Sequence, residues 1–155
     1  MNKILVSYFS ASGVTKRVAM RLAEVLKGDL FEIKPEKPYS SSDLNWNDQN
    51  SRSTKEMNDK ICRPKIIDKV SNIAEYDIVL IGFPVWWYTA PRIINTFIEE
   101  NNLEGKKVYV FVTSGGSSVD GSLNDLKRDY STINFVSGKR LTGYEDNDEY
   151  IDWVK

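Results

Sequence analysis

Short apolar runs alternate with amphipathic stretches along the chain. Runs rich in β-branched and aromatic residues indicate buried strands at residues 3–9, 30–33, 76–83, 107–112 and 133–136. Between them, apolar residues recur every three or four positions, which is typical of helices with one buried face. Strands that alternate with helices predict a parallel sheet covered on both faces, because each parallel pair needs a right-handed crossover.

The apolar stripes also place the helices. The best spaced stripe starts at Ala90, with Thr89 as its expected N-cap. Ile66, Val70 and Ile73 predict another helix before the third strand. Further helices are expected over 14–26, 119–130 and 150–154.

Residues 35–64 do not follow this alternation. The segment is polar, and only residues 52–61 indicate a helical turn or two. So long an irregular connection in a compact domain is often functional. It either packs as an ordered flap through Tyr39, Leu44 and Trp46 or takes part in substrate access.

Composition removes several classes of function. The 155 residues carry a formal net charge of −1, which argues against nucleic-acid or membrane binding through basic patches. The absence of histidine excludes Ser-His-Asp and Cys-His catalysis, and Cys62, as the only cysteine, excludes an internal disulfide. No metal site, targeting signal or membrane span is visible, so we expect one cytoplasmic domain over 1–155. An enzyme of this composition would depend on a cofactor for its chemistry.

Three loops follow the strands at the carboxyl edge of the sheet, where such folds bind ligands. The first consists of Ser10, Ala11, Ser12, Gly13, Val14 and Thr15. It leads into a helix whose free N–H groups favour an anion, and its hydroxyls add donors. It therefore fits a phosphate, although cap and turn residues alone would have the same composition.

The second loop consists of Pro84, Val85, Trp86, Trp87 and Tyr88. Three adjacent aromatic residues cannot all point into one core, so we expect at least one exposed ring, suited to stacking on a flat heterocycle. In the alternative, the rings cover the end of the sheet and the 35–64 segment.

The third loop consists of Thr113, Ser114, Gly115, Gly116 and Ser117. Its glycines let the backbone approach a ligand, although they also suit a plain turn. Together the loops provide a phosphate cradle, an aromatic platform and a glycine-rich polar wall. This combination fits a flat ring joined to a phosphate, such as FMN.

The first loop, following Tyr8 and Phe9, resembles the phosphate loop of flavodoxins, and the strand alternation extends this resemblance over the chain. The resemblance implies a flavodoxin-like three-layer α/β/α sandwich with strand order 2-1-3-4-5 and non-covalent FMN. By position, residues 10–15 would hold the phosphate, 84–88 would flank the isoalloxazine, and 113–117 would contact its pyrimidine side. Residues 43–57 are similar to a flavodoxin-like subfamily, and the uninterrupted fifth strand is similar to the short-chain type.

The chain departs from electron-carrier flavodoxins in three respects. Carriers of this family are strongly acidic, carry an aromatic residue in the third loop, and have a glycine beside the flavin N5. This chain has a charge of −1, no aromatic residue at 113–118 and no glycine at 84–90. Because bulky residues resist positive φ, we expect weak stabilisation of one-electron-reduced flavin.

These departures favour an oxidoreductase over a one-electron carrier that serves a protein partner. The second loop is also similar to that of flavin-dependent quinone reductases, which implies NAD(P)H as donor and a quinone-like acceptor. The flavin would carry the chemistry, with Tyr88 as a candidate hydrogen-bond donor to the acceptor. The sequence leaves open whether the protein is a monomer or a homodimer.

Overall fold

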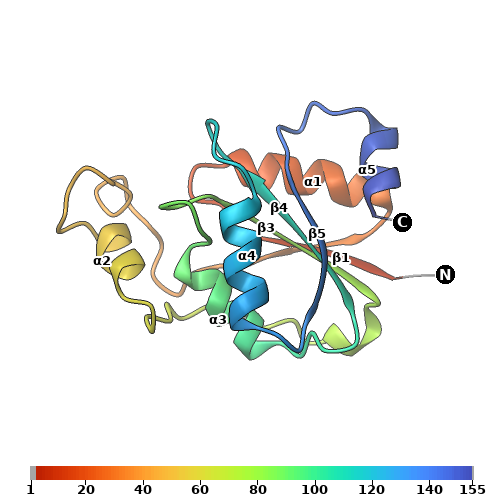
Figure 1. The fold of residues 1–155 in the computed structure, drawn as a ribbon, viewed down its shortest axis with the longest axis horizontal. Helices are drawn as coiled ribbons and strands as arrows, with labels where there is room; N and C mark the ends of the chain where they lie inside the picture. The colour runs from red at the N-terminus through yellow and green to blue at the C-terminus, as the bar shows by residue number, and fades with distance from the viewer. Residues whose placement is uncertain (1–2, 155) are drawn as a thin grey trace.

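A five-stranded parallel sheet forms the centre of the computed structural model, which describes residues 3–154 (Figure 1). Its strands are β1 (Ile4–Tyr8), β2 (Asp29–Glu32), β3 (Ile78–Pro84), β4 (Lys107–Thr113) and β5 (Asn134–Arg140). The helices are α1 (Val14–Leu26), α2 (Arg52–Asn58), α3 (Arg92–Glu100), α4 (Asp120–Asp129) and α5 (Asn147–Trp153), with a 3₁₀ turn, η1 (Ile73–Glu75). The strand order is β2-β1-β3-β4-β5, which confirms the predicted order and fold class.

Two hydrophobic cores lie on opposite faces of the sheet. Ile94 and Phe97 of α3 and Leu126 of α4 pack on one face. Leu22 of α1 and Tyr150 of α5 pack on the other. Figure 1 shows the same division, with α1 and α5 on one side of the strands and α3 and α4 on the other. Coverage on both faces explains why the central strands are continuous apolar runs.

One glycine is required by close packing between β3 and β4. Gly82 pairs with Phe111 in the parallel register. A Cβ at residue 82 would lie 2.0 Å from the Phe111 ring. The absence of a side chain therefore lets the Phe111 ring lie against the β3 backbone.

The segment 35–64 is an ordered flap that extends beyond the sheet edge (Figure 1). The expected helical turns appear as α2, whose N-cap Ser51 accepts a hydrogen bond from the Thr54 N–H. Tyr39 packs against the core as expected, but Trp46 is 71% exposed, so the packing prediction for Trp46 is wrong.

The helix predicted from Ile66, Val70 and Ile73 is wrong. The backbone of this segment bonds to partners distant in the sequence: the Ile67 N–H donates to the Lys34 carbonyl, and the Val70 N–H donates to the Asn101 side chain. The apolar residues still face the core, since Ile66 and Val70 are buried. Only η1 is helical within this region.

Between residues 3 and 154, the longest helix has 13 residues, and no helix combines the length and apolar character needed to cross a bilayer.

Candidate functional site

The carboxyl ends of β1, β3 and β4 lie side by side. The Phe9 N–H donates to the Gly82 carbonyl at 2.9 Å, and the Val85 N–H donates to the Thr113 carbonyl at 3.1 Å. The parallel ladders thus continue to the last residue of each strand. As a result, the three loops singled out from the sequence start from one edge of the sheet.

The first loop forms an open turn at the start of α1. Gly13 occupies the N-cap position with φ 94°, and no other atom lies within 4 Å of where its Cβ would be. Its N–H donates to Ser10 Oγ at 3.0 Å, which fixes the shape of the turn. No side chain caps α1 and no acidic residue lies in its first turn, so the helix start offers its N–H groups to an anion.

The first and third loops are joined by one hydrogen bond. Thr15 Oγ1 and Thr113 Oγ1 lie 2.7 Å apart, and both side chains are buried. Ninety-eight positions separate these residues in the sequence. The Thr15 hydroxyl, expected to face a phosphate, therefore fixes the distance between the two loops, while Ser12 remains exposed.

The second loop is a tight hairpin with two non-glycine residues at positive φ. Trp86 and Thr89 exchange two backbone hydrogen bonds of 3.0 Å, and Trp87 and Tyr88 between them have φ values of 50° and 64°. This is the geometry of a two-residue turn that matches the twist of the flanking strands. The expectation that bulky residues here avoid positive φ is wrong, and the argument from the missing glycine against stabilising one-electron-reduced flavin no longer holds.

Contacts with α4 hold this hairpin in place. Thr89 Oγ1 donates to Asp125 Oδ2 at 2.6 Å. Gly121 lies so close that a Cβ there would be 2.3 Å from the Tyr88 carbonyl oxygen. Thr89 is therefore an anchor of the hairpin and not an N-cap, since α3 begins only at Arg92, after Pro91.

The three aromatic residues of the hairpin divide between packing and exposure. Trp86 points inward and makes edge contacts with Phe9 and Tyr39, with ring centroids 5.7 and 5.5 Å away. Trp87 is 40% exposed and Tyr88 is 79% exposed. The sheet-covering role thus belongs to Trp86, and the rings available for stacking belong to Trp87 and Tyr88.

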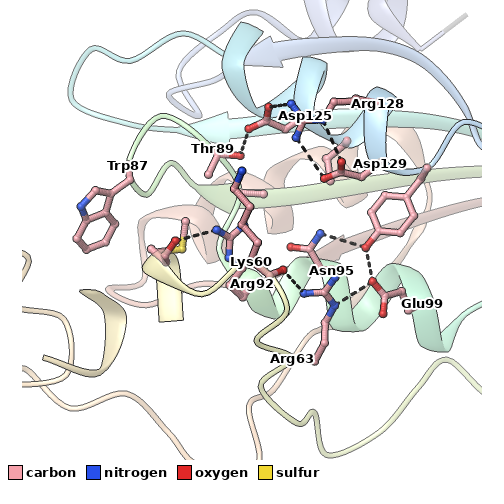
Figure 2. Close-up of a pocket in the computed structure, with 14 residues that line it drawn as sticks. Lys60, Arg63, Trp87, Thr89, Arg92, Asn95, Glu99, Asp125, Arg128 and Asp129 are labelled. Atoms are coloured by element: carbon pink, nitrogen blue, oxygen red, sulfur yellow. Dashed lines mark hydrogen bonds and ion pairs between the residues drawn. The ribbon is translucent and has the colours of Figure 1, made fainter. Parts of the chain in front are cut away.

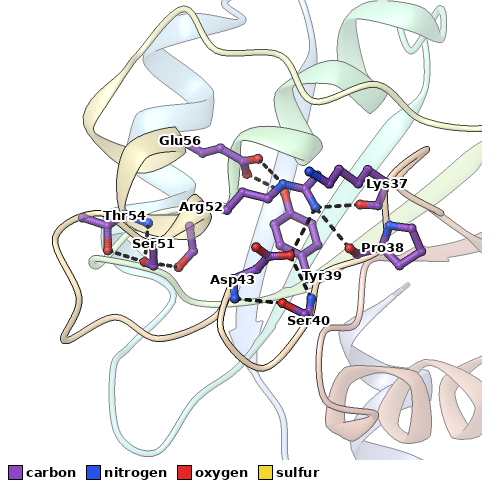
Figure 3. A network of polar contacts seen from close by, with 10 residues as sticks. Lys37, Pro38, Tyr39, Ser40, Asp43, Ser51, Arg52, Thr54 and Glu56 are labelled. Carbon is purple, nitrogen blue, oxygen red and sulfur yellow. Dashed lines mark hydrogen bonds and ion pairs between the residues drawn. The ribbon is translucent and has the colours of Figure 1, made fainter.

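Arg52 and Glu56 of α2 form a charged clamp around Tyr39 (Figure 3). The clamp holds the flap against the aromatic cluster of Phe9, Tyr39 and Trp86. The Arg52 guanidinium lies 3.8 Å from the Tyr39 ring centroid, and its Nε donates to Glu56 Oε2 at 2.9 Å. The Tyr39 hydroxyl donates to the other oxygen of Glu56, which is 8% exposed. Burial and the hydrogen bond to Glu56 raise the pKa of Tyr39, so the phenol keeps its proton.

The third loop is held from the side of β5. Arg140 donates to Ser114 Oγ at 3.1 Å and to the Ser114 carbonyl at 3.0 Å. Ser114 Oγ in turn donates to the Ser117 carbonyl at 2.6 Å. Gly115 and Gly116 are exposed, with open space where a Cβ would stand. Arg140 was not among the predicted site residues, because the fifth strand, expected to end at residue 136, extends to Arg140 at this sheet edge.

Comparisons with known proteins agree with this architecture. A family model described as Flavodoxin matches residues 3–155. A provisionally assigned flavoprotein from Bacteroides eggerthii is 50% identical, with a TM-score of 0.96 over 99% of this chain and 96% of that one. Another from Bacteroides uniformis is 44% identical, with a TM-score of 0.93 over 99% and 97% of the two chains.

A more distant solved structure is the flavoprotein from Lactobacillus acidophilus in complex with FMN. It is 24% identical, with a TM-score of 0.78 over 99% of both chains, and the likeness concerns the fold. No curated protein matches the chain.

Proposed function

The chain belongs to the flavodoxin family, and from this premise we propose that it binds FMN and passes electrons through it to a small acceptor such as a quinone. The observation that carries the proposal is the joining of the phosphate-type loop to the glycine-rich loop through Thr15 and Thr113. That bond holds two of the expected cofactor-binding loops at a fixed separation, beside the aromatic hairpin. A FMN-bound relative of the same fold is consistent with this proposal.

The start of α1 fits the phosphate. The backbone N–H groups at 11, 12, 14 and 15 and the exposed Ser12 hydroxyl would donate to its oxygens, and the α1 dipole favours its charge. Gly13, at φ 94° with open space around it, lets a phosphate approach the backbone closely.

The hairpin fits one face of a flat ring, and the third loop fits the edge on its pyrimidine side. Trp87 and Tyr88 present exposed aromatic surface, and Trp86 packs inward against Phe9 and Tyr39. Residues 113–117 offer backbone groups with no aromatic side chain. A ring held here would keep one face open to a second flat molecule.

Bound FMN would supply the redox chemistry, since it can accept and deliver a hydride or single electrons. We propose NAD(P)H as the donor, because an open ring face permits direct stacking of a nicotinamide. A net charge of −1 provides little long-range steering toward a basic protein partner, which also favours a small acceptor.

A one-electron carrier is the second candidate. Positive φ at Trp87 and Tyr88 keeps this candidate open, because the missing glycine no longer argues against stabilisation of half-reduced flavin. Anaerobic stopped-flow mixing of the FMN-loaded protein with NADPH or NADH, then with menadione, separates the two. The reductase reading predicts flavin bleaching by one nicotinamide and recovery with quinone; no reaction with either nicotinamide, with half-reduced flavin accumulating under dithionite, would establish the carrier instead.

Tyr88 is the residue of the hairpin placed best to touch the acceptor, because its side chain is 79% exposed. We propose that its hydroxyl donates a hydrogen bond to the acceptor oxygen. Tyr88→Phe should then lower quinone turnover several-fold while FMN affinity stays the same. Unchanged turnover would remove Tyr88 from the reaction.

A further inference from the structure

A cavity of about 700 Å³ lies beside the second loop, between the hairpin, α3, α4 and the end of the flap (Figure 2). Of the expected FMN-contacting residues, only Trp87 lines it. Its volume is within the range typical of small-molecule sites. Its walls carry both charged and aromatic side chains, so the pairing of the charges decides what it could bind.

The carboxylates of the cavity already have partners. Asp125 accepts from Thr89 and from Arg128, which also pairs with Asp129 at 3.1 Å. Glu99 pairs with Arg63 at 2.9 Å. Each of these carboxylates therefore has a cationic partner within the wall, and Asp125 and Asp129 share the guanidinium of Arg128.

Two cations of the cavity, Arg92 and Lys60, have no carboxylate as a partner among the described residues. Arg92 is half-buried and donates only to the carbonyls of Glu56 and Met57, at 3.3 and 2.7 Å. Within residues 3–154, no carboxylate lies within ion-pair distance of Arg92 or Lys60. Figure 2 shows both on the flap side of the cavity, opposite Asp125 and Arg128. A half-buried guanidinium without a counter-ion favours an anion beside it.

We propose that this cavity is a binding site for an organic anion with a flat ring, recognised through Arg92 and Lys60. The anionic group, a phosphate or a carboxylate, would accept hydrogen bonds from the Arg92 guanidinium and the Lys60 ammonium. The ring would lie toward Trp87, whose indole lines the hairpin side of the cavity. A nucleotide phosphate and an aromatic carboxylate share this chemistry. The site is distinct from the α1 phosphate loop and does not depend on FMN.

Calorimetric titration tests the proposal with two probes, adenosine 2′,5′-bisphosphate and 4-nitrobenzoate. Each is added to the FMN-saturated protein, in which FMN occupies the phosphate loop, and to the FMN-free protein. Lys60→Glu is compared with Lys55→Glu, which makes the same charge change on an exposed α2 residue that does not line the cavity. Both changes are at exposed positions, and circular dichroism confirms that the variants are folded.

We expect saturable binding of at least one probe, weakened about tenfold or more by Lys60→Glu and unchanged in Lys55→Glu. Preference for the bisphosphate would identify a nucleotide site, and preference for the nitrobenzoate would identify an aromatic-acid site. No saturable binding of either probe, or equal weakening in both variants, would overturn the proposal. Because the FMN-free protein is titrated as well, binding at this cavity can be tested even if the protein does not bind FMN.

Discussion

At the scale of single residues, the hairpin shows how tertiary contacts override local preference. Trp87 and Tyr88 hold positive φ although both are bulky. Left-handed backbone costs non-glycine residues about 1–2 kcal/mol each. Thr89, anchored to Asp125, and the contact between Gly121 and the Tyr88 carbonyl hold the turn in this geometry. Neither anchor can be inferred from the sequence of the loop.

This strain predicts an unusual order of stability for substitutions at Tyr88. Tyr88→Ala and Tyr88→Gly remove the same exposed side chain, but only glycine adopts φ near 64° without strain. Tyr88→Gly should therefore be more stable than Tyr88→Ala by about 1 kcal/mol, despite the larger backbone entropy of glycine in the unfolded chain. Urea unfolding of both variants measures the difference. An alanine variant as stable as the glycine variant would show that the turn carries no such strain.

Glu145 gives a second residue-scale prediction, through pH. Burial alone would raise the pKa of Glu145, but hydrogen bonds from the Thr142 backbone and side chain and from Tyr150 outweigh it and lower the pKa to about 2. Its ordinary value is 4.5, so the folded state favours the charged carboxylate. The resulting stability is present above pH 4.5 and is lost as the pH falls toward 2.

Glu145→Gln removes this charge at constant size. Its urea midpoint should lie below that of the parent protein at pH 7, and the gap should narrow progressively between pH 4.5 and 2. A gap that does not change with pH would mean that the charge of Glu145 contributes nothing to folding.

At the scale of elements, the flap is a packed part of the structure. Arg52, Glu56 and Tyr39 link α2 to the aromatic cluster beneath the hairpin (Figure 3). The side chains of Arg52 and Glu56 are 18% and 10% exposed. Removing one member of so buried a pair leaves the other charge without compensation.

Arg52→Ala should therefore lower the free energy of unfolding by about 3 kcal/mol and speed protease cleavage within residues 35–64. Lys55→Ala, three positions along α2 and exposed, is the matched control and should change neither property. Equal cleavage of the two variants would show that the clamp does not hold the flap.

A strand could be predicted from the sequence where it is buried on both faces of the sheet. The strands β3 and β4 are buried on both faces, so their apolar runs indicated them directly. The helix predicted over 66–73 is absent because the spacing of buried side chains does not determine the hydrogen-bond partners of the backbone. The N–H groups of Ile67 and Val70 bond to Lys34 and Asn101, which lie far away in the sequence. The three site loops were predictable from their place after the strands, whereas the Thr15–Thr113 bond and the support from Arg140 depend on tertiary packing.

At the scale of the whole molecule, the strand order brings distant segments to one edge. Because β1 and β3 are neighbours and β4 follows, three loops far apart in sequence meet where the connections diverge. The α1 start supplies anion-binding groups, the hairpin supplies exposed rings, and the third loop supplies an open polar wall. The proposed redox function depends on their acting together on one cofactor.

Parallel titrations of the FMN-free protein with FMN and with riboflavin are the most direct test of the proposed FMN site. The two ligands share the ring and differ in the phosphate, which the start of α1 would hold. We predict one FMN per chain, bound about 100-fold or more tightly than riboflavin, because charge-assisted hydrogen bonds to the phosphate are strong. Equal affinities would contradict the phosphate site, and no binding of either ligand would contradict the proposal that this protein binds FMN.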